Sequence, residues 1–261
     1  MQFRILTLGD LIGRSGRSVV REKLPALIAE QSVDMVVANG ENASGGFGLI
    51  EANAKAVLAA GVDVITSGNH IWNRPETAGF IGRYPNILRP ANYPDTLPGS
   101  GRFLFRHSGK GVKVGVLNLL GRVFMPPMES PFFKAETEIA ALREEGADLI
   151  VVDFHAEATA EKEALGIYLS DKVELVVGTH THVQTSDEKI IAGRMGYISD
   201  LGRCGSFVSV LGFDAQQSIR GFLTDTQQRC DPCKDELVLE GLIADFDVET
   251  RRCVSLKRIR I

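Results

Sequence analysis

The sequence predicts an α/β fold, because strand-like and helix-like patterns alternate along its 261 residues. Short runs rich in Val, Ile and Leu, most of them ending in Gly or His, predict strands at 3–9, 33–40, 62–68, 113–120, 147–155 and 173–180. Apolar residues three and four positions apart predict helices between several of these runs, at 15–31, 51–61 and 132–146. A chain of this length can bury one large core, so we expect a single domain over residues 1–261.

Two further features complete the predicted fold. The segments 236–250 and 252–261 predict consecutive strands with a turn at Glu249 and Thr250, so the sheet should finish in antiparallel pairing. The segment 73–110 is rich in Pro, Gly and Arg, which indicates loops that could form a small cap beside the main sheet. We expect this cap segment to belong to the single domain.

Composition limits the partners of the chain. The formal net charge of −4 leaves no broad basic surface for long nucleic acid, although a small nucleotide substrate would need only local positive charge. The N-terminal MQFRILTLGD enters a strand-like pattern without the features of a signal peptide, and no apolar run approaches the roughly 20 residues that cross a bilayer. We therefore expect a cytoplasmic protein that acts on a small molecule and not on a membrane, and a homo-oligomer is compatible with this composition.

The cysteines do not follow the pattern of a secreted disulfide framework. Cys204, Cys230, Cys233 and Cys253 all lie late in the chain. The CDPC at 230–233 has the spacing of a zinc knuckle or of a redox pair, but no second pair supplies the other two ligands that a structural zinc needs. The pattern favours reduced thiols in an exposed loop.

Polar residues that could bind a ligand stand where the predicted strands end. In an open α/β sheet ligands bind beyond the carboxyl ends of the strands, so residues distant in sequence can meet in one pocket. Each residue alone also has a structural explanation, since a single His can cap a backbone carbonyl and an Asn can serve a tight turn. The set holds four of the five histidines and comprises Asp10, Glu41, Asn42, Asn69, His70, His155, His180 and His182.

Imidazoles, carboxylates and carboxamides together suit a transition-metal site. Mn²⁺, Fe²⁺ and Zn²⁺ accept mixed nitrogen and oxygen ligands, whereas Mg²⁺ and Ca²⁺ sites are built from oxygen. The candidates are too many for one tetrahedral zinc, so the count predicts two divalent ions that share a carboxylate. In an extended segment, His180 and His182 would point to the same side and could address neighbouring ions.

These motifs and their order resemble the calcineurin-like metallophosphoesterases, and within them the YmdB-like branch. The resemblance is carried by GD at 9–10, NGEN at 39–42, GNH at 68–70 followed by Trp72, the lone His155 and GTHTH at 178–182. Leu11 and Ile12 follow Asp10 where the commonest family pattern has a His, and Glu41 replaces the usual bridging Asp. YISDLG and LIADFDVET extend the similarity over nearly the whole chain.

The resemblance implies a layered α/β/β/α sandwich with mixed sheets, and a dinuclear centre of iron or manganese, with zinc as a further option. It places on the first ion Asp10, Glu41, Asn42 and His182. It places on the second ion Glu41, Asn69, His155 and His180. It implies phosphodiesterase activity on 2′,3′-cyclic nucleotides, with a hydroxide bridging the metals as nucleophile and His70 as proton donor to the leaving oxygen. An imidazolium near a dianionic site is expected to have a raised pKa, which suits that role.

Other functions remain compatible with the same ligands. A regulatory protein could bind a nucleotide through its metals without turnover, and a phosphomonoesterase or an amide or ester hydrolase could use the same ions. His70 favours an enzyme, because a binding protein needs no proton donor. The SGGFG at 44–48 could bring backbone N–H groups to a phosphate or could be a flexible turn, and glycines 9, 13 and 16 miss the dinucleotide-binding spacing.

Overall fold

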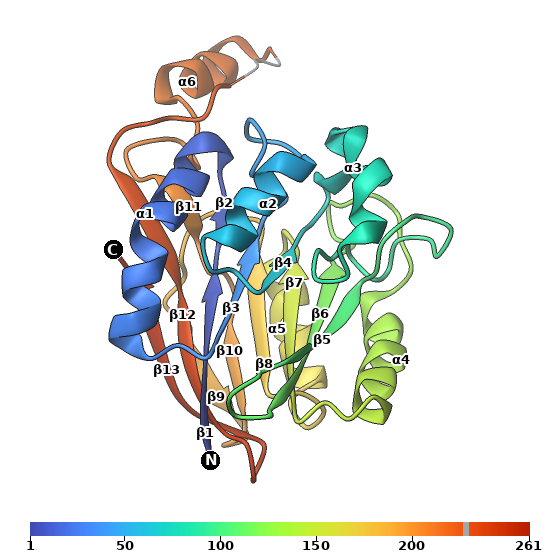
Figure 1. Ribbon diagram of the computed structural model, residues 1–261. Helices are drawn as coiled ribbons and strands as arrows, with labels where there is room; N and C mark the ends of the chain where they lie inside the picture. The colour runs from blue at the N-terminus through green and yellow to red at the C-terminus, as the bar shows by residue number, and fades with distance from the viewer. Residues whose placement is uncertain (227–229) are drawn as a thin grey trace.

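The computed structural model describes residues 1–226 and 230–261 (Figure 1). Two mixed β-sheets pack face to face, and helices cover their outer faces. The predicted α/β/β/α sandwich is therefore confirmed. Within the part of the chain that the structure describes, no helix combines the length and the apolar character needed to cross a membrane.

The first sheet joins the N-terminal strands to the C-terminal ones. Its members are β1 (Gln2–Leu8), β2 (Asp10–Leu11), β3 (Met35–Asn39), β4 (Val64–Thr66), β11 (Arg203–Ser206), β12 (Leu237–Asp247) and β13 (Arg252–Arg260). The order is β2-β11-β12-β1-β3-β4, with β13 also paired to β12. β1, β3 and β4 are parallel, whereas β12 is antiparallel to β1 and to β13, so the predicted antiparallel finish is confirmed.

The second sheet has a parallel centre and antiparallel edges. Its members are β5 (Arg102–Arg106), β6 (Lys113–Leu120), β7 (Leu149–His155), β8 (Leu175–Thr179), β9 (Lys189–Ile191) and β10 (Met195–Ile198). The order is β5-β6-β7-β8-β10-β9, and β6, β7, β8 and β10 run parallel. Most of the predicted loop segment 73–110 lacks strands, but its residues 102–106 form β5, which the composition did not predict.

The helices are α1 (Gly13–Gln31), α2 (Glu51–Ala59), α3 (Glu76–Phe80), α4 (Pro131–Glu144), α5 (Thr159–Tyr168) and α6 (Ala215–Thr224), with 3₁₀ turns η1 (Ile71–Asn73) and η2 (Ile81–Arg83). The predicted helices 15–31, 51–61 and 132–146 correspond to α1, α2 and α4. Figure 1 shows α6 standing away from the sheets, at the end of the molecule toward which β1 runs. No residue of α6 is buried.

The side chains of the apolar strands alternate between the two faces of each sheet and so form three hydrophobic layers. In β3, Val37 faces the layer between the sheets, whereas Val36 packs beneath α1 and α2. In β7, Val151 faces the same central layer, whereas Val152 packs beneath α4 and α5. Because successive strand side chains point to opposite faces, a continuous apolar run can serve two layers at once.

Gly178 in β8 provides a test of how closely the second sheet packs. A Cβ atom at this position would lie 1.8 Å from the backbone oxygen of Ser199, so Gly178→Ala forces backbone to move. We expect a loss of about 1–3 kcal/mol or more in the free energy of unfolding. Gly79→Ala is the control, because a Cβ there would meet no described residue within 4 Å apart from its chain neighbours and the backbone of its own helix. Equal midpoints of denaturant unfolding for both variants would contradict this packing.

Candidate active site

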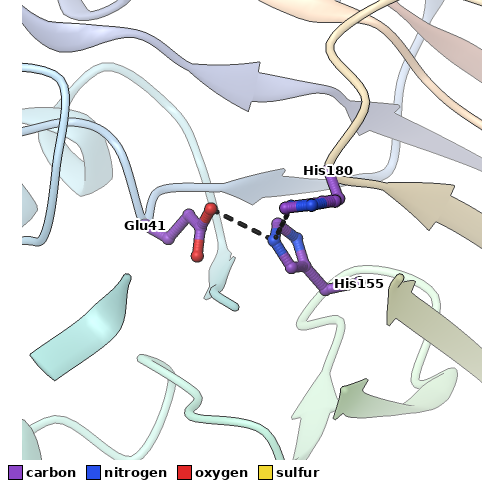
Figure 2. Close-up of side chains that lie close together, drawn as sticks. All are labelled: Glu41, His155 and His180. Atoms are coloured by element: carbon purple, nitrogen blue, oxygen red, sulfur yellow. Dashed lines mark hydrogen bonds and ion pairs between the residues drawn. The ribbon is translucent and has the colours of Figure 1, made fainter. Parts of the chain in front are cut away.

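The carboxyl ends of strands from both sheets meet at one place and bring the predicted residues together. Asp10 follows β1, Glu41 follows β3, His155 ends β7 and His180 follows β8. One ligand atom from each of Glu41, His155 and His180 lies within 4.8 Å of the others, a grouping that could hold a metal ion. Figure 2 shows the Glu41 carboxylate and the His180 ring both directed toward the His155 ring. The predicted convergence of distant strand ends is therefore confirmed.

One half of the site is built around Asp10. The carboxylate Oδ1 of Asp10 lies 3.6 Å from Nε2 of His182, and the amide nitrogen of Asn42 lies 3.3 Å from the same Nε2. That amide nitrogen also donates to Oε1 of Glu41 at 3.0 Å. Oδ1 of Asp10 and Oδ1 of Asn42 are buried with no hydrogen-bond partner among the described residues. Buried oxygens without partners are costly, and a cation would satisfy both.

The other half is built around His155. Its Nε2 lies 3.1 Å from Oε1 of Glu41, 3.1 Å from Oδ1 of Asn69 and 3.0 Å from Nδ1 of His180. Glu41 thus contacts both halves of the site through one carboxylate. These donors are the mixed nitrogen and oxygen set that Mn²⁺, Fe²⁺ and Zn²⁺ accept.

Hydrogen bonds behind His155 fix which of its nitrogens faces the cluster. The hydroxyl of Thr179 donates to Oδ1 of Asp153 at 2.7 Å, so its oxygen must accept from Nδ1 of His155, 2.9 Å away. Asp153 also accepts hydrogen bonds from Thr66 and from Asn39. In its neutral form the ring therefore keeps its proton on Nδ1 and presents the Nε2 lone pair to the cluster, as a metal ligand requires.

The other two histidines are oriented in the same manner. Nδ1 of His182 lies 3.1 Å from the backbone oxygen of Leu211, so Nε2 faces Asp10. Nε2 of His180 lies 3.0 Å from Oε2 of Glu157, so Nδ1 faces His155. Each ring therefore has one nitrogen at a hydrogen-bond acceptor and the other at the cluster. The donor set and its supports fit a metal centre.

The charges of the site also favour a cation. Burial opposes ionisation of Asp10 and Glu41, but the neighbouring imidazoles outweigh it and lower the pKa of both carboxyls. Burial opposes the charged form of His155 too, yet Glu41 and Asp10 raise its pKa to about 9. Burial and the adjacent His155 lower the pKa of His180 to about 4. The two ionised, buried carboxylates thus stabilise positive charge on the neighbouring His155, and they would stabilise a bound cation in the same way.

The backbone of the histidine loop differs from its predicted extended form. His180 has φ 104° and His182 has φ 59°, so the extended geometry expected for these residues is wrong. Asp200 holds the loop, because its Oδ2 accepts from the N–H of Thr181 at 3.0 Å and from its hydroxyl at 2.8 Å. Lys162 donates to the same oxygen at 2.9 Å. The tight turn sends the two rings to different halves of the site.

His70 lies beside the metal-compatible cluster, not within it. Its backbone N–H donates to Oε2 of Glu41 at 2.9 Å, and its ring Nδ1 lies 3.1 Å from the amide nitrogen of Asn73. The expected rise in its pKa is wrong, because burial and the neighbouring imidazoles lower the pKa more than Glu41 raises it. Its ring lines an open cleft of about 1040 Å³ above the cluster.

Hydrogen bonds from Arg74 fix the conformation of the glycine-rich loop 44–48. Gly45, Gly46 and Gly48 have φ of 71°, 92° and 76°, a conformation that favours glycine. Arg74 donates to the backbone oxygen of Ser44 at 2.7 Å and to that of Phe47 at 3.1 Å. The loop therefore presents Phe47 to the cleft in a fixed position.

Several residues of the site lay outside the sequence prediction. Asp153 is a charged residue inside the apolar run LIVVDFH, and that contrast was a usable signal. The residues of the outer cleft wall form no recognisable sequence motif, and they include Val210, Leu211, Phe213, Ser218, Gly221 and Phe222.

The CDPC loop is less exposed than expected, because it pairs with the segment 212–213. The N–H of Cys233 donates to the backbone oxygen of Gly212, and Pro232 forms a β-bridge with Phe213. The metal-compatible group among the described residues contains no cysteine.

Known proteins are similar to this chain in sequence or in fold. A family model described as YmdB-like protein matches residues 6–259. A 2′,3′-cyclic-nucleotide 2′-phosphodiesterase of Bacillus subtilis is 41% identical, over 99% of this chain and 97% of that protein. A crystal structure of a phosphatase of Mycoplasma pneumoniae has a TM-score of 0.92 at 32% identity, over 100% of this chain and 94% of that chain. The 5′-nucleotidase precursor of Thermus thermophilus, with a TM-score of 0.61 over 100% of this chain and 54% of that chain, shares the fold alone at 12% identity.

The layered fold, its cluster of carboxylates and imidazoles, and the phosphodiesterase and phosphatase relatives identify a phosphoesterase of the metallophosphoesterase class. Within that class, the chain belongs to the YmdB-like family. The predicted enzyme class and family are both confirmed by these relatives.

Thr179 allows the orienting hydrogen bonds behind His155 to be tested. Thr179→Val keeps the size of the side chain but removes the hydroxyl that accepts from Nδ1 of His155. We expect Mn²⁺ affinity, measured by titration calorimetry on chelator-treated protein, to fall about 10- to 100-fold. Thr179→Ser retains the hydroxyl and should stay close to the unaltered protein. An equal loss in both variants would show that the hydroxyl does not orient the ligand.

Proposed function

We propose that this protein is a dinuclear-metal phosphodiesterase that hydrolyses small phosphodiesters, with 2′,3′-cyclic nucleotides as its substrates. The observation that carries the proposal is the cluster itself: two buried, ionised carboxylates, Asp10 and Glu41, face three imidazoles at the floor of an open cleft. The name of the Bacillus subtilis relative supports the substrate class.

The proposed ligands divide between two ions. The first ion would be held by Asp10, Glu41, Asn42 and His182. The second would be held by Glu41, Asn69, His155 and His180. The bridging role of Glu41 is supported by its Oε1, which lies 3.0 Å from the amide of Asn42 and 3.1 Å from Nε2 of His155. Mixed nitrogen and oxygen donors favour iron or manganese, with zinc as an alternative.

Two ions, when bound, would supply a water activated as hydroxide at neutral pH and would neutralise charge on the phosphate oxygens. The chain itself would provide the proton for the leaving oxygen, from His70. Support comes from position, because the His70 ring lines the cleft next to Glu41 while Asn73 contacts its Nδ1. A bound phosphate anion would counteract the effect of burial on the pKa of His70.

Two alternative functions can be distinguished from the proposed one by a hydrolysis assay. The Mycoplasma pneumoniae structure is named a phosphatase, so phosphomonoesters are the second substrate class to test. A metal-dependent regulatory protein would bind nucleotide without turnover. The single domain over 1–261, the cytoplasmic location and a homo-oligomeric state stay predictions from the sequence.

A hydrolysis panel tests the proposed function directly. Protein treated with chelator should be inactive, and Mn²⁺ or Fe²⁺ should restore hydrolysis of 2′,3′-cyclic nucleotides in preference to phosphomonoesters. The expected preference follows from the substrate named for the Bacillus subtilis relative, because an alkoxide leaves from both kinds of ester and a proton from His70 would serve either. Turnover of phosphomonoesters alone would establish the phosphatase alternative, and nucleotide binding without any turnover would establish the regulatory one.

His70→Ala tests the proton donor. The variant should retain its metals but lose about 10²- to 10⁴-fold in kcat on a substrate with a poorly acidic leaving group. The loss should shrink for p-nitrophenyl esters, since p-nitrophenolate leaves without protonation. His107→Ala is the control, because His107 lies outside the cleft, against Phe3. Equal losses on both substrates would remove the general-acid role.

A further inference from the structure

The cleft above the cluster has an aromatic wall that the proposed metal ligands do not explain. Its volume of about 1040 Å³ exceeds what a phosphate group needs. Phe47, from the glycine-rich loop, lines it together with Phe213 and with Phe222 of α6. A large, partly apolar cleft with a few convergent polar groups is suited to an organic ligand.

Phe47 and Phe213 form a two-ring ledge next to His70. The two phenyl rings are stacked, with centroids 5.4 Å apart and planes 21° apart. Phe47 also meets the His70 ring edge to face, with centroids 4.9 Å apart. The Phe47 end of the ledge therefore contacts His70, the proposed proton donor.

The ledge is fixed before any ligand arrives. Arg74 donates to the backbone oxygen of Phe47 at 3.1 Å and braces its loop. Gly46 lies so close to Phe213 that a Cβ there would be 2.6 Å from the ring. A preorganised aromatic surface binds a flat ligand without a further cost of ordering.

Phe222 adds a third aromatic ring, which is not part of the hydrophobic core. It is 85% exposed and stands on α6, none of whose residues is buried. Its ring nevertheless lines the same cleft as the ledge. An aromatic side chain exposed on a cleft wall offers a free face for stacking.

We propose that Phe47, Phe213 and Phe222 bind the base of the nucleoside cyclic phosphate and thereby select nucleotides over simpler cyclic phosphates. This inference rests on the proposed function. Cleavage at the 2′ position breaks the bond from phosphorus to O2′, joins a water oxygen to phosphorus, and gives O2′ a proton, leaving a nucleoside 3′-phosphate. O2′ is carried by C2′, whose neighbour C1′ carries the base. With O2′ at His70, the base on the adjacent carbon is within reach of Phe47, whose ring centroid lies 4.9 Å from that of His70.

The test compares two substrates that differ only in the group on C1′, which is adenine in one and methoxy in the other. Metal-loaded protein is assayed with adenosine 2′,3′-cyclic phosphate and with 1-O-methylribose 2′,3′-cyclic phosphate, and the ratio of kcat/KM values is measured. Unaltered protein should favour the nucleotide, and Phe222→Ala should lower the ratio about 5- to 150-fold, the range for loss of one stacking ring. Phe47→Leu, which keeps apolar bulk but removes the aromatic face, should lower it as well.

Phe133→Ala is the matched control, because Phe133 is 70% exposed on α4 and does not line the cleft. It should leave the ratio unchanged. Equal hydrolysis of both substrates by unaltered protein, or an unchanged ratio in Phe222→Ala and Phe47→Leu, would overturn base binding while the proposed function stands. Hydrolysis of neither substrate would contradict the proposed function, and base binding would fall with it.

Discussion

The site depends on keeping two carboxylates ionised where water cannot reach them. Asp10 and Glu41 are both fully buried, and burial alone would favour their neutral forms. Nearby positive charge and hydrogen bonds offset that cost. Imidazoles surround the pair, and the backbone N–H groups of His180 and His70 donate to Asp10 and Glu41. Because the oxygens of Asp10 and Asn42 keep unused lone pairs, protons on the histidines do not satisfy the site completely. A bound cation would satisfy both oxygens, so the charge arrangement fits a metal centre.

The two-sheet architecture brings the residues of the site together. Parallel strands in both sheets end at the same place, so each sheet contributes candidate ligands from one side, β1 and β3 from the first and β7 and β8 from the second. Supporting groups then fix the rings: Thr179 and Asp153 behind His155, and a buried Lys162–Asp200 pair beneath the loop that carries His180. A left-handed backbone at a histidine is strained, and surrounding bonds of this kind are what keep such a conformation populated.

The sequence predicted this centre better than it predicted its surroundings, for physical reasons. Strand cores and the polar residues after them follow from local pattern, so the central strands and the meeting of the candidate ligands were predictable. The turn at His180 was not, because Asp200, distant in sequence, sets its backbone. The direction of the His70 pKa depends on burial, which no motif encodes. β5 was missed because an edge strand depends on pairing with its neighbour, β6, which local sequence does not encode. α6 was missed because helix propensity alone is a weak signal for an exposed helix with no buried face.

The central claim is that one carboxylate, Glu41, lies between two ions. Anomalous X-ray diffraction at the manganese absorption edge, from crystals of protein reconstituted with Mn²⁺, would locate the ions directly. We expect two peaks about 3.5–4 Å apart, one within ligand distance of Asp10 and His182, the other of His155 and His180, with Glu41 bound to both. A single peak, or two peaks that do not share Glu41, would contradict the claim.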